Sequence, residues 1–204
     1  FSSSNPNLQN IPIRGEEGLK IRETFIAGEG HVLMAADYSQ IELRLLAHYS
    51  NDEALIEAFA KDEDVHLRTA SQIFDLPPEK ITSDLRRQAK TVNFALIYGK
   101  TPFGLAKELQ ISQKMAKLYI DNYFAHYKGV QKFINDILAE VRETGKTETL
   151  LGRVRSLPDI NSKNNNVRMA AERVAVNTSF QGSAADIIKL AMTNMDNALT
   201  ERNA

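Results

Sequence analysis

The sequence predicts an α/β, or more broadly α+β, fold that is predominantly helical, and three patterns support this prediction. A short apolar run over residues 32–36 is typical of a strand buried on both faces. Amphipathic helical patterns fill most of the chain between residues 46 and 160, and a hairpin pattern lies near their end. We therefore expect a helical subdomain inserted into an α/β base.

Composition is that of an ordinary globular protein. The chain has 204 residues, 43% of them hydrophobic and 25% charged, and it contains no cysteine, which excludes disulfides and thiolate metal sites. No apolar run approaches the roughly 18 residues that a membrane helix needs, and no signal peptide is recognisable. We expect a cytoplasmic protein that does not bind membranes.

The net charge of −1 gives no overall attraction to nucleic acid, but the charge is unevenly distributed. Residues 52–64 are acidic and residues 142–173 are mainly basic, as expected if one surface faces a polyanion. The chain starts without methionine and stops soon after a helical pattern, so we interpret it as a segment of a longer polypeptide.

The expected elements follow from local patterns. Residues 1–18 are polar, contain prolines and predict loop. Residues 40–49 place an apolar stripe on one helix face, and residues 52–75 predict two helices with a break near residues 62–65. Pro77-Pro78 predicts a turn. The remaining expectations are helices over 111–127, 130–143, 167–176 and 183–199, a hairpin over 147–157 that turns at Leu151-Gly152, and a polar loop over 161–166.

Residues 86–99 predict the most informative helix. Thr82 or Ser83 can cap its start, and Gly99 suits its end. Two cations and then two aromatic residues recur every four positions and so share one stripe: Arg86, Lys90, Phe94 and Tyr98. Apolar residues lie on the opposite side of the same helix: Leu85, Ala89, Val92 and Leu96.

Cations suit phosphates and aromatic faces suit bases, so this stripe has the order of groups that a nucleoside triphosphate would meet. A solvated cationic face or an aromatic stripe packed into the core is the alternative. Asp37 follows the expected strand directly before a helix, where open α/β sheets place reactive groups, and its carboxylate can hold Mg²⁺. Its alternative is a helix N-cap, and Glu42 by itself is only a carboxylate at the start of a helix.

Six segments, in order, resemble segments of family A DNA polymerases, the bacterial DNA polymerase I type. Asp37 to Arg44 resembles the first palm motif, and Arg86 to Gly99 resembles the fingers-helix motif R-x-x-x-K-x-x-x-F/Y-x-x-x-Y-G. The other similar segments are 7–14, which resembles the primer–template loop, 64–70, which resembles D-x-H-x-x-T-A, and 152–160 and 181–186. The resemblance covers essentially the whole chain.

The resemblance implies a DNA-directed DNA polymerase, a nucleotidyltransferase of replication and repair. It would join a deoxynucleotide to a primer 3′-hydroxyl and release pyrophosphate. Asp37 would be one of two catalytic aspartates of a two-Mg²⁺ site, with the Tyr38 carbonyl as a further ligand. Lys90, the second implied catalytic residue, would neutralise or protonate the departing pyrophosphate.

The resemblance also implies two sets of binding residues. The nucleotide-binding set is Arg14, Gln40, Glu42, His66, Arg86, Lys90, Phe94 and Tyr98, in which Glu42 and Tyr98 would exclude a ribose 2′-hydroxyl. The DNA-binding set is Asn7, Gln9, Asn10, Arg173, Asn177 and Gln181. Without the resemblance, His66 would be a structural histidine, Arg14 a solvated cation, and the DNA set turn residues and a polar helix face.

By the same resemblance, residues 1–45 would form a first part of the palm, 46–160 the fingers and 161–204 a second part of the palm. The implied partners are primer–template DNA and deoxynucleoside triphosphates, with the protein a monomer that binds no membrane.

The sequence departs from the family pattern in several places. Ser179 replaces a common proline, which makes a helix break before Gln181 less certain. Phe94 replaces the tyrosine of some members, so we expect strong rejection of dideoxynucleotides. None of the four histidines is followed by aspartate, so the His-Asp-Glu motif of the second catalytic aspartate is absent, as are the thumb and any exonuclease domain. We therefore expect the isolated chain to be inactive or nearly so.

Two other functions compete with this interpretation. A single-subunit RNA polymerase shares the metal-site logic, but Glu42 argues against an enzyme that must admit the 2′-hydroxyl. A non-catalytic nucleic-acid-binding module would have no use for Asp37 together with a row of cations suited to a triphosphate.

Overall fold

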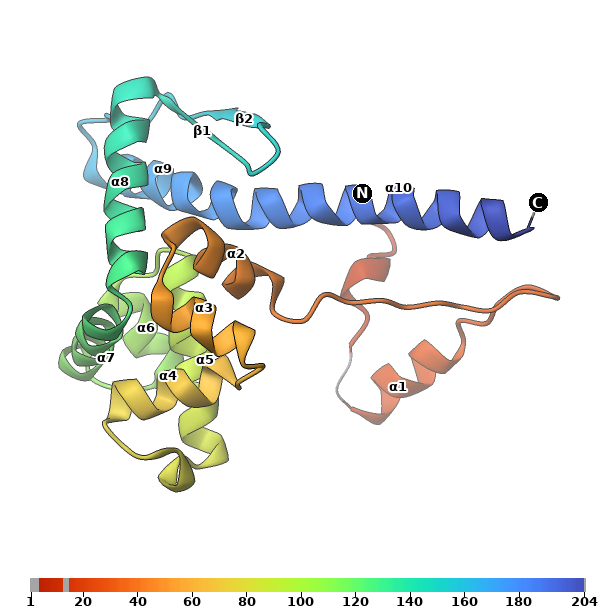
Figure 1. The fold of residues 1–204 in the computed structure, drawn as a ribbon, viewed down its shortest axis with the longest axis horizontal. Coiled ribbons are helices and arrows are strands. Elements are labelled where there is room, and N and C mark those ends of the chain that lie inside the picture. The colour runs from red at the N-terminus through yellow and green to blue at the C-terminus, as the bar shows by residue number, and fades with distance from the viewer. Residues whose placement is uncertain (1–3, 13–14, 204) are drawn as a thin grey trace. The chain divides into compact units, whose positions relative to one another are not determined.

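The computed structural model describes residues 4–12 and 15–203, and the chain divides into two units, Phe1–Ser39 and Gln40–Ala204. Helices dominate, with one small two-stranded sheet among the described residues (Figure 1). The prediction of a predominantly helical fold is thus confirmed. Within the described part of the chain, no helix is both long and apolar enough to cross a membrane.

The N-terminal unit contains a short helical turn, η1 (Leu8–Asn10), and the helix α1 (Glu16–Glu23). The prediction that residues 1–18 form only loop is therefore wrong. Helix α1 has acidic residues in its first turn and basic residues in its last, as the helix dipole favours, and Gly18 is its one buried residue. Because α1 buries only this glycine, its sequence lacks the repeating apolar positions by which a helix is predicted.

The expected buried strand at residues 32–36 is also absent. The segment is an extended trace in Figure 1 outside any described sheet, and Val32, Leu33 and Met34 are 88%, 67% and 62% exposed. A strand requires a neighbouring strand for its backbone hydrogen bonds. The described strands, β1 (Lys146–Glu148) and β2 (Val154–Ser156), pair with each other in an antiparallel hairpin. Apolar composition alone therefore gave a wrong prediction here.

The second unit holds nine α-helices in its described residues. Their bounds are α2 Ile41–Ser50, α3 Glu53–Ala60, α4 Val65–Phe74, α5 Ser83–Ile97, α6 Pro102–Leu109, α7 Gln113–His126, α8 Lys128–Thr144, α9 Asn165–Asn177 and α10 Ser183–Asn203. A 3₁₀ turn, η2 (Pro78–Lys80), precedes α5. All of these except α6 were predicted, as was the hairpin turn at Gly152, whose φ is 80°. Helix α6 was not predicted because it has only 8 residues, although it carries two start signals, a proline at its first position and a Thr101 cap.

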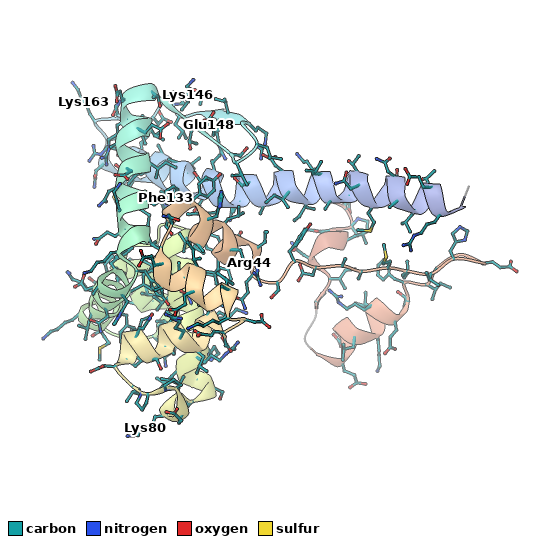
Figure 2. All side chains as sticks on the ribbon, in the orientation of Figure 1. Arg44, Lys80, Phe133, Lys146, Glu148 and Lys163 are labelled. Carbon is teal, nitrogen blue, oxygen red and sulfur yellow. The ribbon has the colours of Figure 1, made fainter. Side chains whose placement is uncertain are left out.

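Aromatic packing joins three parts of this unit. Phe133 of α8, labelled in Figure 2, has its ring centroid 5.4 Å from that of Tyr49 in α2 and 5.7 Å from that of Phe180. The Tyr49 hydroxyl lies 2.7 Å from Ser183 Oγ at the start of α10. These contacts fix α2 and α8 against the junction between α9 and α10, and this junction carries Gln181.

The junction is a π-helical turn, η3 (Thr178–Gly182), that runs directly from α9 into α10. The helix continues through Ser179, where the resemblance noted above makes a proline common, because serine keeps the backbone N–H that proline lacks. A π turn is wider than an α turn. The π turn therefore changes the direction in which Gln181 follows Arg173 and Asn177 of α9.

Candidate nucleotide and nucleic-acid site

Helix α5 carries the cation and aromatic stripe. The Thr82 hydroxyl caps its start by accepting the backbone N–H of Leu85, and the helix ends at Tyr98. Lys90 is exposed, and Arg86 is half-buried. The predicted apolar face is confirmed, because Ala89, Val92 and Leu96 are buried while Leu85 is half-buried. These residues pack α5 against the core and leave the cations at the surface.

The two aromatic residues of the stripe are half-buried. The ring centroids of Phe94 and Tyr98 lie 6.1 Å apart, and both rings also pack against the core. The expectation that they lie away from the core is thus only partly met. Phe94 also lies 6.0 Å from the His66 ring of α4. The stripe therefore begins with half-buried Arg86 and exposed Lys90 and ends with two half-buried aromatic rings.

Tyr98 joins three elements of the second unit. Its hydroxyl donates to Glu42 Oε2 of α2 at 2.8 Å, and Gln181 of η3 also hydrogen-bonds to this side chain. Burial and the neighbouring Glu42 carboxylate raise the pKa of Tyr98 to about 12, against the smaller lowering effect of Gln181. Tyr98 is therefore protonated at neutral pH and holds Glu42 in place.

His66 is 3% exposed, so the structure shows it as a buried histidine. Its Nδ1 lies 3.1 Å from Asn93 Nδ2. An amide N–H can only donate, so this contact assigns Nδ1 as the acceptor and leaves the proton on Nε2. Burial and then the positive charges of Arg86 and Lys90 lower the pKa of His66 to about 4, although Asp64 opposes them. His66 is thus a neutral donor at pH 7.

Sequence reasoning missed Asn93, which is fully buried on α5. Its amide contacts His66 and also bonds to the hydroxyl of Thr69, which lies 3.2 Å from the Tyr127 hydroxyl. A polar residue among the apolar positions of an amphipathic helix was the available signal, because buried amides need partners.

The remaining expected residues of the second unit lie on α2, α9 and η3. Gly99 has φ of 62°, and a Cβ there would lie 3.0 Å from Cγ of Arg173, so glycine allows α9 to approach α5 closely. Gln40 is the N-cap residue of α2 in a left-handed conformation. Two amide oxygens, Asn177 Oδ1 and Gln40 Oε1, are buried and have no hydrogen-bond partner in the described part of the chain.

The other expected residues belong to the N-terminal unit. Asp37, Asn7 and Asn10 are exposed. Asp37 is not the N-cap of α2, since Gln40 takes that position, so the N-cap alternative is not supported. Arg14 lies outside the described residues, as does the side chain of Gln9.

Asp37 and Tyr38 place a carboxylate and a backbone carbonyl next to each other in sequence. Both are hard oxygen donors of the kind that Mg²⁺ prefers. Over residues 4–12 and 15–203, no group of three His, Cys, Asp or Glu side chains is arranged to hold a metal ion. The Asp37 carboxylate and the Tyr38 carbonyl could therefore supply some of the ligands of a magnesium ion, but not a complete set.

Comparison with known proteins identifies the family. The model of DNA polymerase family A matches residues 1–204. This chain belongs to DNA polymerase family A. It is 53% identical over 201 residues to DNA polymerase I of Pseudomonas aeruginosa, covering 98% of this chain and 22% of that protein. It is 52% identical over 205 residues to DNA polymerase I of Lactococcus lactis subsp. cremoris, covering all of this chain and 23% of that protein.

A solved structure shows the same fold as this family A chain. The POL domain of Pol1 from M. smegmatis, in complex with DNA primer-template and dNTP, matches with a TM-score of 0.93 and 49% identity. The match covers 100% of this chain and 36% of that one. The chain thus spans less than a quarter of the length of the two curated relatives. Polymerases of this family are in general metal dependent.

Proposed function

We propose that this chain is part of a protein that performs template-directed DNA synthesis, and that it carries much of the site for the incoming nucleotide. The observation that carries this proposal is the stripe on α5, from Arg86 and Lys90 to Phe94 and Tyr98, with Glu42 hydrogen-bonded to its last member. Family membership supports the proposal, and so does the similar M. smegmatis domain, which was solved in complex with dNTP.

Each residue of the stripe has a chemical role in this proposal. Arg86 and Lys90 hold the triphosphate, because a guanidinium and an ammonium group bind phosphate oxygens through charge-assisted hydrogen bonds. Lys90 also neutralises the charge that develops on the departing pyrophosphate. Phe94 packs against the sugar and base. The proposal also assigns nucleotide binding to Arg14, Gln40 and His66, with His66 donating through Nε2.

Glu42 and Tyr98 select the sugar. The bond from the Tyr98 hydroxyl fixes the Glu42 carboxylate, and a fixed side chain occupies the space that a ribose 2′-hydroxyl would need. A steric exclusion of this kind is strong only if the wall is rigid. The contact to Gln181 adds a third element to this wall and joins it to the proposed DNA-binding residues.

Asp37 and the Tyr38 carbonyl would hold Mg²⁺, which neutralises phosphate charge and aligns the attacking and leaving oxygens when bound. The proposed DNA contacts are Asn7, Gln9, Asn10, Arg173, Asn177 and Gln181. Amide donors suit the acceptors that every base pair presents in the minor groove, so binding there would show little sequence preference. In this proposal residues 46–160 are the fingers, and 1–45 and 161–204 belong to the palm of a monomeric enzyme.

Binding of dATP to the 204-residue chain in the presence of Mg²⁺ tests the proposal. We expect Lys90→Ala to weaken binding roughly tenfold or more, because it removes a charge-assisted bond to phosphate. Lys117→Ala is the matched control, since Lys117 is an exposed lysine on α7 that pairs with Asp121. Salt-sensitive DNA binding without nucleotide binding, unaffected by Lys90→Ala, would instead support a non-catalytic module.

A further inference from the structure

Asp64 contacts two residues of the proposed nucleotide site, His66 and Arg86. It is the N-cap residue of α4. Its Oδ1 accepts the backbone N–H groups of His66 at 3.0 Å and Leu67 at 3.1 Å, and its Oδ2 accepts Nε–H of Arg86 at 2.6 Å. One carboxylate therefore joins the start of α4 to the first cation of the stripe on α5.

These contacts hold the carboxylate from two sides. The N-cap bonds fix Asp64 to the α4 backbone, so Arg86 is bonded to an anchor that belongs to a packed helix. The bond to Asp64 uses only the Nε–H of the guanidinium. The Nη1 and Nη2 groups retain four N–H donors in the planar fork that suits phosphate oxygens.

Exposure and charge agree with this arrangement. The side chains of Arg86 and Asp64 are 43% and 36% exposed, so a ligand in solvent has access to the guanidinium. Burial raises the pKa of Asp64, but hydrogen bonds from Arg86 and from the α4 backbone outweigh it and lower the pKa below the usual value. Asp64 is therefore an anion at neutral pH and pairs with Arg86 as a charge.

We propose that Asp64 is a positioning residue that holds the Arg86 guanidinium so that its Nη groups meet the triphosphate. This inference rests on the proposed function. The opposite relation is that Asp64 competes with the triphosphate for Arg86, in which case its removal would tighten binding. Positioning is favoured because the carboxylate occupies one edge of the guanidinium and is itself bonded to α4.

The test measures the dissociation constant of dATP with Mg²⁺ for the 204-residue chain and its variants. Asp64→Ser keeps an N-cap acceptor and removes the carboxylate. Asp84→Ser is the matched control, because it also replaces an aspartate that pairs with an arginine of α5, in this case Arg87. We expect Asp64→Ser to weaken binding roughly five- to tenfold, as for other coupled neighbours, and Asp84→Ser to leave it unchanged.

A double-mutant cycle shows whether Asp64 acts through Arg86. Arg86→Ala alone should weaken binding at least as much as Asp64→Ser, and Asp64→Ser should add nothing in the Arg86→Ala background. An equal loss in both backgrounds would overturn the proposal, as would unchanged or tighter binding by Asp64→Ser. Failure of the unchanged chain to bind dATP would refute the proposed function itself, and this inference with it.

Folding of the variants is checked by circular dichroism and thermal unfolding. An exposed ion pair contributes little to stability, so Asp64→Ser should unfold near the temperature of the unchanged chain. If Asp64→Ser does not fold, Asp64→Asn is measured instead, because asparagine keeps the N-cap acceptor and removes only the negative charge. Weaker dATP binding by Asp64→Asn then supports the proposal, and unchanged or tighter binding overturns it.

Discussion

Two regions that carry proposed catalytic residues differ in how their structure arises. Helices α4 and α5 hold His66, Arg86 and Lys90 by contacts within one unit, including buried Asn93 and the Asp64–Arg86 pair. The segment at residues 32–37 leads to Asp37 through exposed apolar residues that belong to no described sheet. The α4–α5 pair, with its proposed nucleotide-binding residues, is thus held by contacts within its own unit, whereas the described residues 32–36 that precede Asp37 are exposed and lie in no described sheet.

The largest effect on stability should appear when alanine replaces one leucine in each of the two units. Leu46 of α2 is 1% exposed, whereas Leu33 is 67% exposed. We expect Leu46→Ala to lower the free energy of unfolding by about 2–5 kcal/mol, because it removes buried methyl groups and leaves a cavity. Leu33→Ala should change it by less than about 0.5 kcal/mol. Urea unfolding followed by circular dichroism measures both, and similar losses for the two variants would refute the contrast.

The buried amide of Asn93 should give the next largest effect. Asn93→Ala leaves the Thr69 hydroxyl and His66 Nδ1 without this partner, so we expect a loss of about 1–3 kcal/mol in the free energy of unfolding. Asn122→Ala is a control on α7, where a half-buried asparagine bonds to one backbone carbonyl. If Asn93→Ala were no more destabilising than this control, the network would not be what joins α4 to α5.

Local pattern explains which features the sequence predicted. The start and end of α5, its apolar face and the hairpin turn depend on residues a few positions apart, and all of these were predicted. The strand at residues 32–36 was predicted wrongly, because strand pairing depends on distant segments. Contacts between helices cannot be read from local spacing. The contact of Glu42 with Tyr98 was predicted only through the family resemblance. The buried Asn93 and the Asp64–Arg86 pair were missed, because no spacing rule links α4 to α5.

The pH dependence of stability should separate His66 from an exposed histidine. Burial lowers the pKa of His66 in the folded chain to about 4, whereas a histidine in the unfolded chain has a pKa near 6.5. Between these two pH values the unfolded chain binds a proton at His66 and the folded chain does not. Stability should therefore fall as pH decreases from about 6.5 to about 4, by up to about 3 kcal/mol from this group. His66→Gln should reduce this loss, whereas substitution of exposed His48 should not. Urea midpoints between pH 4 and 8 give the comparison, and parallel curves for all three proteins would contradict it.

The smallest effect on stability should come from the Tyr98 hydroxyl. Tyr98→Phe removes the bond to Glu42 but keeps the ring, and both side chains are half-buried, so we expect a loss near 1 kcal/mol or less in the free energy of unfolding.

The effect of Tyr98→Phe on sugar selection should be clearer, because Glu42 is then no longer held in place. The ratio of ATP to dATP dissociation constants should decrease in Tyr98→Phe. Tyr119→Phe, in which a tyrosine of α7 outside this site changes in the same way, should leave the ratio unchanged. An unaltered ratio in Tyr98→Phe would show that Glu42 excludes the 2′-hydroxyl without help from α5, or that the wall lies elsewhere.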